Sequence, residues 1–200
     1  DTPKYDLIVV GAGINGLGVA REAAERGLSV GLLEKTDLCA GVSAWSGRLV
    51  HGGLRYLEHG DVPLVRESLR ERERLFRQAP HLVKPVDLLM PFYAENTRSS
   101  WMIRLGMIAY DALSFDKSVH AHRILSKHKV LKRFPGMNER GLSGSAVFVD
   151  GQVEYAERLC VEIALAAAEA GAVLRFHSRV TDVLSEGGRA IGVRFVDSGG

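Results

Sequence analysis

Three glycines near the start of the chain have a spacing that suits the binding of a phosphorylated ligand. Gly11, Gly13 and Gly16 follow the pattern G-x-G-x-x-G, and an acidic residue, Glu34, comes further along. In this pattern the first glycine makes a tight turn, the second lets backbone approach a pyrophosphate, and the third allows helix and strand to pack closely. Glu34 can accept hydrogen bonds from both hydroxyls of a ribose. The spacing therefore predicts a dinucleotide site.

A strand, a helix and a second strand must position these residues. Residues 7–10 are a short apolar run typical of a buried strand, and residues 28–33 are another. The helix between them begins at the glycine turn, where its positive end faces the phosphates, and Gly27 ends it in the left-handed conformation. Glu34 disfavours a 2′-phosphate, which would meet a like charge. NAD and FAD both stay open, as does a glycine-rich turn of another α/β domain.

The stretch at residues 37–53 is rich in glycine and in hydrogen-bond donors. It contains Ser43, Ser46, Arg48 and the pair Gly52-Gly53. Paired glycine lets the backbone approach a flat ligand closely. An ordinary loop has the same composition, so both interpretations stay open.

Arg55 lies in a short helical turn predicted at residues 54–58. A guanidinium beside a cofactor loop can hold a phosphate or a carboxylate through two parallel hydrogen bonds. An ion pair with Glu58, three residues on, is the alternative interpretation.

The composition is typical of a globular protein of one domain, or of one domain with part of another. The 200 residues include 46% hydrophobic and 25% charged side chains, and the net charge of +2 is too small to indicate a nucleic-acid partner. Two cysteines, Cys39 and Cys160, favour a reducing compartment over a disulfide framework. We expect no secretory signal, no membrane-spanning segment and a cytoplasmic location. A turn signal at residues 196–200 predicts that a further strand follows.

Helices and strands alternate along the rest of the chain. Helices are predicted at residues 61–79, capped by Asp61 and with their charged side chains in solvent, at 101–115, and at 155–170, ended by Gly171. Strands are predicted at residues 86–90, 146–149, 173–176, 180–184 and 191–196. The helix at 155–170 and the strand after it are typical of a return to the nucleotide sheet. We therefore expect residues 1–80 and 150–200 to form one domain and residues 81–149 an insertion.

Residues 117–133 carry six lysines and arginines, the histidines His120, His122 and His128, and no acidic residue. A solvated surface is one interpretation of this segment. A patch that faces anionic lipid headgroups or an anionic substrate is the other. No cysteine or carboxylate joins the histidines within the segment, so no metal site is expected.

Taken in order, these pieces resemble the N-terminal part of the membrane-associated, aerobic-type FAD-dependent glycerol-3-phosphate dehydrogenases, over essentially the whole chain. The most specific motif is L-V-H-G-G-L-R-Y-L-E at residues 49–58. Further matches are V-G-A-G-I-N-G at 10–16, R-G-L-S-V at 26–30, A-P-H-L at 79–82 and W-M-I-R-L-G at 101–106. The resemblance implies an α/β fold, with a Rossmann-like FAD-binding domain of the glutathione-reductase type and part of an inserted substrate or cap domain.

The resemblance also implies an activity. FAD would be the cofactor, and sn-glycerol 3-phosphate would be oxidised to dihydroxyacetone phosphate by hydride transfer to flavin N5, with electrons passed to a quinone. Arg55 would bind the substrate phosphate, and His51 is the candidate base. The enzyme would lie peripherally on the cytoplasmic face of the inner membrane, and a homodimer stays open.

Cofactor contacts are implied in the same way. Gly11, Gly13, Asn15 and Gly16 would surround the pyrophosphate, Glu34 would hold the ribose, and backbone near Val180 would reach the adenine. The residues expected along the flavin are Ser43, Ser46, Leu49, His51, Gly52 and Gly53.

The chain departs from the family pattern at three places. Val42 stands where threonine is common, Gly47-Arg48 where serine and lysine are common, and Glu154 where aspartate is usual. These differences bear on cofactor affinity and substrate preference. Family members continue well beyond residue 200, and their later segments carry further phosphate-binding residues.

Two other functions stay open. An amine or amino-acid oxidase of the same flavin fold shares the glycine and glutamate pattern, and only the motif at residues 49–58 argues against it. A nucleotide-binding regulatory module, or an FAD-binding fragment that catalyses nothing, is the second alternative.

Overall fold

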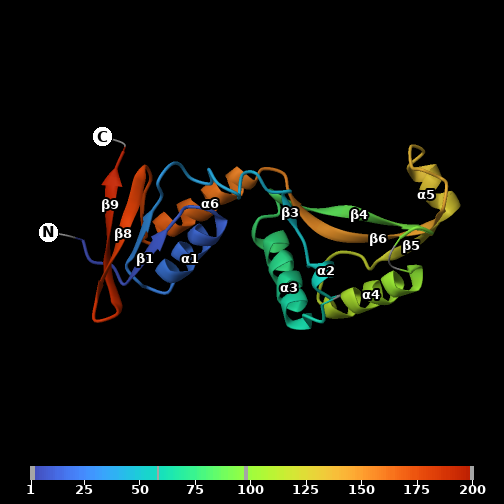
Figure 1. The fold of residues 1–200 in the computed structure, drawn as a ribbon, viewed down its shortest axis with the longest axis horizontal. Coiled ribbons are helices and arrows are strands. Elements are labelled where there is room, and N and C mark those ends of the chain that lie inside the picture. Colours follow the sequence, from blue (N-terminus) through green and yellow to red (C-terminus); the bar gives the residue numbers. More distant parts are fainter. Residues whose placement is uncertain (1–2, 58, 97–98, 199–200) are drawn as a thin grey trace. The chain divides into compact units, whose positions relative to one another are not determined.

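The computed structural model describes residues 3–57, 59–96 and 99–198 (Figure 1). The chain divides into two compact units: one holds the residues up to Arg48 together with those from Tyr155 onward, and the other spans Leu49–Glu154. The predicted domains, 1–80 with 150–200 and 81–149, differ from these units in the placement of residues 49–80 and 150–154. In the structure these residues contact the strands and helices of the second unit.

Three parallel strands form the sheet of the first unit, in the order β1 (Leu7–Val10), β2 (Val30–Leu33) and β7 (Val173–Arg175). Val10 pairs with Leu33, and Leu33 pairs with Arg175. All four residues of β2 are buried, as expected for a strand covered on both faces. The predicted return of the chain to the nucleotide sheet is confirmed by β7.

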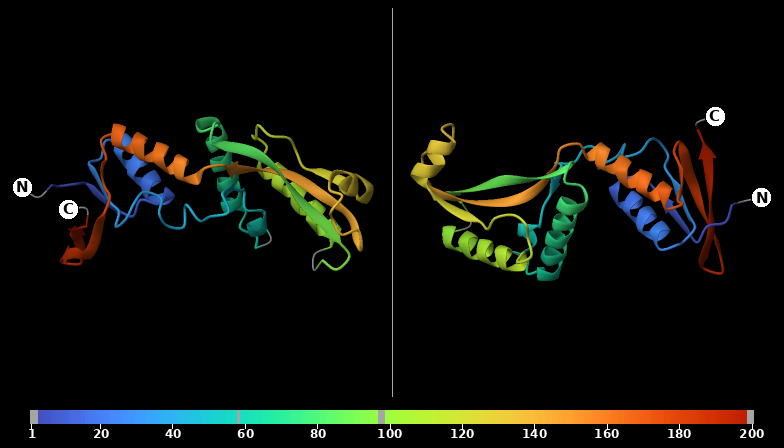
Figure 2. Two further views of the ribbon diagram at one scale, coloured as in Figure 1. Left: turned by 90° about the horizontal axis from the view of Figure 1, so that it is seen from above. Right: turned by 180° about the vertical axis from the view of Figure 1, so that it is seen from behind.

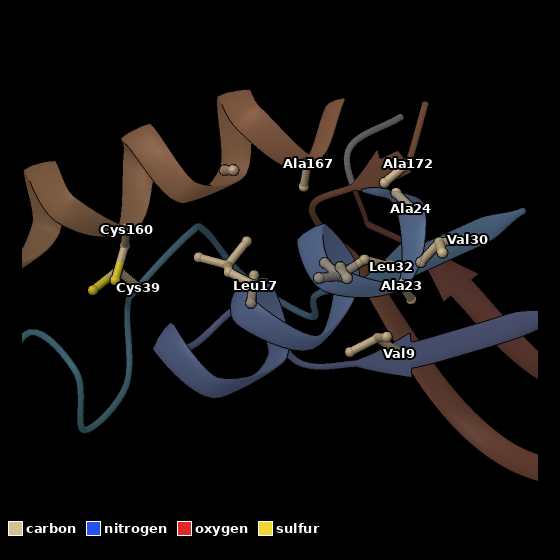
Figure 3. Packing of buried hydrophobic residues seen from close by; sticks show 13 residues of the cluster. Val9, Leu17, Ala23, Ala24, Val30, Leu32, Cys39, Cys160, Ala167 and Ala172 are labelled. Atoms are coloured by element: carbon tan, nitrogen blue, oxygen red, sulfur yellow. The ribbon is translucent and has the colours of Figure 1, made fainter. Parts of the chain in front are cut away.

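Two helices, α1 (Ile14–Glu25) and α6 (Ala156–Glu169), pack on each other and complete this core (Figure 3). Alanines dominate the buried face of both helices, so their backbones approach closely around Leu17. Cys39 and Cys160 are free, buried thiols whose sulfur atoms lie side by side. Burial, followed by the contact with Cys39, raises the pKa of Cys160 to about 12, so this cysteine is a thiol at neutral pH.

Both helices end in the same glycine cap. The Gly27 N–H bonds to Ala24 O and the Leu28 N–H to Ala23 O, with Gly27 at φ 84°. Gly171, at φ 100°, ends α6 with the same two bonds. Each is a Schellman motif, which satisfies the last carbonyl groups of a helix. The second strand begins at Val30 and not at residue 28 as predicted, because Leu28 belongs to the cap.

An antiparallel hairpin completes the first unit. Its strands are β8 (Ser178–Glu186) and β9 (Arg189–Asp197), and Gly187 and Gly188 join them with φ values of 57° and 79°. Positive φ at both central residues is the conformation of a two-residue hairpin turn whose twist matches that of the strands.

The second unit is built on a long antiparallel ribbon of β4 (Val83–Tyr93) and β6 (Leu142–Val153). The short strands β3 (Leu49–Val50) and β5 (Arg123–Ser126) pair with different parts of β6. Pro85 and Pro91 lie inside β4, whereas the predicted strand, residues 86–90, is confined to the stretch between these two prolines. Proline is tolerated there because β4 is an edge strand of the sheet.

Helices cover one face of this ribbon (Figures 1 and 2). They are α2 (Leu54–Leu57), α3 (Val62–Gln78) and α4 (Ser100–Leu113), while α5 (Lys127–Arg133) follows β5. Asp61 caps α3 as predicted, accepting a hydrogen bond from the Leu64 N–H at 3.3 Å. The core of this unit lies between α3, α4 and the ribbon, around Leu69, Met107 and Phe148.

One prediction for α3 is wrong. Its charged residues were expected to face solvent, yet Arg72 and Glu73 are buried. Arg72 falls on the same helix face as Val65, Leu69 and Phe76, and this face is covered by β6. Buried charges of this kind need partners, and Arg72 has one in Asp150 of β6.

The basic segment at residues 117–133 faces acidic residues from elsewhere in its unit. Arg123 and Arg133 both reach Asp87, and Lys127 reaches Glu139 at 3.1 Å. Lys117 and His122 pair with Asp111. Within the described ranges, no helix is long and apolar enough to cross a membrane.

Candidate functional site

The glycine turn of the first unit has the geometry of a phosphate cradle. Gly11 has φ 106°, which strongly favours glycine. A Cβ on Gly16 would lie 2.0 Å from the carbonyl oxygen of Gly11, so the helix can approach the turn this closely only with glycine there. A Cβ on Gly13 would make an ordinary contact with Ser43 Oγ at 3.4 Å, whereas one on Gly11 would meet nothing within 4 Å, so the turn is open beside Gly11.

The N-terminus of α1 follows the turn directly. Gly13 is the N-cap and supplies no side chain to the first-turn N–H groups. Ser43 Oγ accepts a hydrogen bond from the Ile14 N–H at 3.0 Å, and Asn15 is exposed in the same turn. Such a helix end, with its N–H groups and positive dipole, stabilises an anion.

Glu34 ties the end of β2 to the glycine turn. Its Oε2 accepts from the Ala12 N–H at 2.8 Å, and its Oε1 accepts from the Thr36 N–H at 2.9 Å. Partial burial alone would raise the pKa of Glu34, but these hydrogen bonds and the charge of Lys35 outweigh it and lower the pKa. The side chain is therefore a carboxylate at neutral pH, and it keeps acceptor capacity for ribose hydroxyls.

The strand that carries Val180 begins beside Glu34. The Ser178 N–H donates to Glu34 O at 2.7 Å, and Val180 follows two residues later, at an irregularity in the pairing of β8 with β9. The strand that carries Val180 is therefore anchored to the backbone of Glu34 at its first residue, and a contact of Val180 with adenine stays a prediction.

The loop after β2 is held against the cradle by backbone and side-chain bonds. The Cys39 N–H donates to Ala12 O at 3.0 Å, and Ser46 Oγ donates to Ser43 O at 3.3 Å. Arg48, at φ 56°, pairs with Glu157 at 2.8 Å. The two serines expected near the flavin thus lie in one hydrogen-bonded loop.

The remaining predicted residues lie at the start of the second unit. His51 is exposed, and its Nδ1 accepts a hydrogen bond from the Gly53 N–H at 3.1 Å, so the neutral ring carries its proton on Nε2. With Leu49, His51 lines a cavity of about 510 Å³ that is bounded by α3. Arg55 is exposed in α2, and its predicted partner Glu58 lies outside the described residues.

Gly52 has a role that sequence reasoning missed. A Cβ there would lie 2.3 Å from the Tyr110 hydroxyl and from Leu69 Cδ2, so glycine is required by the protein's own packing. The Gly52 N–H also points to Asp150, the partner of buried Arg72. The sequence holds no local signal for this role, because Tyr110 and Asp150 lie far from Gly52 along the chain.

The structure thus groups the predicted residues in two sets. Gly11, Gly13, Asn15, Gly16, Glu34, Ser43, Ser46 and Val180 lie in the first unit, and Leu49, His51, Gly52, Gly53 and Arg55 in the second. That both sets face one flavin stays a prediction. The first set fits the ADP part of a dinucleotide, because it combines an open glycine turn, a helix N-terminus whose N-cap residue supplies no side chain, and an ionised carboxylate.

Comparison with known proteins agrees with this geometry. Glycerol-3-phosphate dehydrogenase of Synechocystis sp. is 55% identical over 85% of this chain, which covers 31% of that protein. D-erythritol 1-phosphate dehydrogenase of Brucella abortus is 42% identical over 97% of this chain, which covers 38% of it. The crystal structure of glycerol-3-phosphate dehydrogenase from Bacillus halodurans complexed with FAD has a TM-score of 0.71 at 26% identity, covering 98% of this chain and 31% of that one.

The chain spans about a third of the length of these relatives. A sequence profile described as FAD dependent oxidoreductase matches residues 6–200. The fold is accordingly the predicted α/β fold with a Rossmann-like FAD-binding domain, and the chain belongs to the FAD dependent oxidoreductase family.

Proposed function

We propose that this chain is the FAD-binding part of an enzyme that oxidises sn-glycerol 3-phosphate to dihydroxyacetone phosphate. The cradle of the first unit carries the cofactor half of the proposal, because it presents an open glycine turn and an ionised Glu34 to an ADP moiety. The substrate half is supported by relatives at 42–55% identity that are named as dehydrogenases of phosphorylated polyols.

The cradle residues have distinct roles in this proposal. The N–H groups at the start of α1 and the Ser43 hydroxyl hold the pyrophosphate, and Glu34 accepts from the ribose hydroxyls. Bound FAD supplies the hydride acceptor, while the protein contributes position and electrostatics. Residues 49–53 are proposed to lie along the flavin, as the resemblance implies.

Arg55 is proposed to bind the substrate phosphate. Its guanidinium is exposed on a short helix and can form two parallel, charge-assisted hydrogen bonds to a dianion. His51 stays the candidate base. In the present geometry its Nδ1 accepts a hydrogen bond from the Gly53 N–H, so its Nε2–H is the group that can donate to a ligand. As a donor, His51 would stabilise the substrate oxygen. To act as a base through Nδ1, His51 would first have to break the hydrogen bond that this atom accepts from the Gly53 N–H.

We further propose that electrons pass to a quinone and that the whole protein contacts the membrane peripherally, on the cytoplasmic face. The relatives are named as dehydrogenases, and the family match is to FAD dependent oxidoreductases. Together these two findings support a final electron acceptor other than a nicotinamide. Residues 117–133 give the membrane contact little support, since several of their cations already face Asp87, Asp111 and Glu139. A homodimer stays a prediction.

Absorbance spectroscopy of the full-length protein tests the proposal. We expect a flavin band that bleaches when glycerol 3-phosphate is added under anaerobic conditions. A matched panel should contain glycerol, a four-carbon polyol phosphate and several amino acids. Bleaching by amino acids alone would identify an amino-acid oxidase instead. A flavin band that no compound bleaches would indicate an FAD-binding module without catalytic activity. Protein that cannot be reconstituted with FAD would refute the proposal outright.

A further inference from the structure

Two buried polar side chains, Tyr110 and Asp150, accept hydrogen bonds from the backbone N–H of Gly52, and a third, Arg72, donates to both of them. Asp150 Oδ1 accepts hydrogen bonds from Arg72 Nη1 at 2.5 Å and from the Tyr110 hydroxyl at 2.8 Å. The Gly52 N–H donates to the Tyr110 oxygen at 3.1 Å and to Asp150 Oδ1 at 3.3 Å. We call Arg72, Tyr110 and Asp150 the Gly52 clamp.

The clamp is assembled from three separate elements of the second unit. Arg72 comes from α3, Tyr110 from α4 and Asp150 from β6, and each is at most 2% exposed. Burial, followed by the charge of Asp150, raises the pKa of Tyr110 well above its usual value. The hydroxyl therefore stays protonated and donates to Asp150 while its oxygen accepts from Gly52.

Stability alone does not account for this arrangement. A buried ion pair loses its hydration, and well-packed apolar residues of similar size are often as stabilising. A hydrogen-bonded polar network differs from an apolar core in fixing one geometry. Here the geometry that is fixed is that of Gly52, which the Tyr110 hydroxyl and Leu69 also confine sterically.

Gly52 lies between the two residues proposed to act on the substrate. His51 precedes it and is held by the next N–H, that of Gly53. The short helix α2, which carries Arg55, begins at Leu54 and packs against α3 and α4, the helices that supply Arg72 and Tyr110. A shift of Gly52 would therefore move His51 and Arg55 together.

We infer that Arg72, Tyr110 and Asp150 are positioning residues for the oxidation of glycerol 3-phosphate. They hold residues 51–55 in the arrangement that substrate binding requires, and they act through the Gly52 N–H without touching substrate or flavin. This inference rests on the proposed function.

The test is Tyr110→Phe in the full-length, FAD-loaded enzyme, because this change removes one hydroxyl and keeps the ring that packs edge-on against Phe148. We expect kcat/KM for glycerol 3-phosphate to fall by about 10- to 100-fold, as a small misplacement of binding groups does. We expect both parameters to change: the KM should rise and kcat should fall. A purely structural defect would instead lower FAD content and apparent kcat together and leave KM unchanged.

Tyr93→Phe is the matched control. Its hydroxyl also donates one hydrogen bond within the second unit, to Asn138 O at 3.1 Å, but it takes no part in the clamp. If Tyr110→Phe and Tyr93→Phe have the same KM and kcat, the inference is overturned. If Tyr110→Phe fails to hold FAD, Arg72→Met combined with Asp150→Leu replaces the buried charges by apolar groups. A raised KM in this folded variant supports the inference, and an unchanged KM overturns it.

Amide hydrogen exchange separates this inference from the proposed function. Exchange in residues 49–57 should be roughly 5- to 10-fold faster in Tyr110→Phe than in Tyr93→Phe, because one hydrogen bond to Gly52 is lost. This measurement needs no turnover. Wild-type enzyme that binds FAD but does not oxidise glycerol 3-phosphate would refute the proposed function, whereas equal exchange in the two variants would refute the clamp.

Discussion

Replacing Gly16 by alanine should damage both folding and FAD binding. The added Cβ would lie 2.0 Å from the Gly11 carbonyl oxygen, where ordinary contact begins near 3.4 Å, and it would also meet a side-chain methyl of Val9. The close neighbour is backbone, so α1 and the turn must separate by more than an ångström. Overpacking of this kind costs about 1–3 kcal/mol, and we expect the upper end because no flexible side chain can yield.

The same separation should weaken the cofactor site. Moving the start of α1 away from the turn changes the direction of the N–H groups that would hold the pyrophosphate. Thermal unfolding of the full-length protein measures the first effect, and titration of the apoprotein with FAD, followed by flavin fluorescence, measures the second. In a cooperative unit of about 150–250 residues, a loss of about 3 kcal/mol corresponds to a fall of roughly 6–12 °C in the unfolding temperature, and the fall is smaller where a larger unit unfolds together.

Gly18→Ala is the control for this experiment, because Gly18 lies in the same helix and a Cβ there meets nothing within 4 Å. Alanine has the higher helix propensity, so this variant should be neutral or more stable by up to about 1 kcal/mol. Unchanged stability and FAD affinity in Gly16→Ala, measured beside Gly18→Ala, would refute the view that the turn and the helix are held together by close packing.

Three further predictions concern Glu34 and Arg55. Glu34→Gln should weaken FAD binding about tenfold in the same titration, because charge-assisted hydrogen bonds to the ribose become neutral ones, and equal affinity would argue against a ribose contact. Since the pKa of Glu34 is lowered in the folded protein, the stability that it contributes is present above its unfolded pKa and is lost as the pH falls through the folded one. The free energy of unfolding, measured with denaturant between pH 7 and pH 3, should therefore decline less steeply with falling pH in Glu34→Gln than in the wild type. Parallel curves for the two proteins would contradict this. Arg55→Ala should raise the KM for glycerol 3-phosphate roughly 10- to 150-fold, from about 1.5–3 kcal/mol of lost charge-assisted bonding, while FAD affinity stays unchanged. An unaltered KM would show that another residue anchors the phosphate.

Local patterns were sufficient for much of the first unit. The turn at Gly11, the helix end at Gly27 and the helix end at Gly171 each depend on a backbone conformation that glycine adopts most readily, and all three are found in the structure. The carboxylate at Glu34 was also located from spacing alone, and its contact with the Ala12 N–H places it beside the turn. The glycine features can be predicted because the residues that determine them lie within a few positions of each other, and Glu34 can be predicted because it follows the second strand of a recognisable strand–turn–helix–strand pattern.

Features that depend on distant parts of the chain were missed. The strand β4 continues through Pro85 and Pro91 because it pairs with β6 along its whole length, and its own sequence indicates only a short strand. Arg72 was assigned to solvent because its partner Asp150 is far away in sequence. The requirement for glycine at position 52 likewise arises from Tyr110, and no local signal distinguishes it from a glycine that approaches a ligand.

The sheet order of the first unit has a consequence for synthesis. The outer edge of β2 is paired by β7, and all of the second unit is translated between these two strands. At a rate of about 5–20 residues per second, the nascent chain exposes that edge for on the order of ten seconds before β7 emerges. A ribosome-bound intermediate should therefore contain a folded antiparallel unit beside an unfinished nucleotide sheet, and it is this intermediate that a chaperone would have to protect from pairing with other chains.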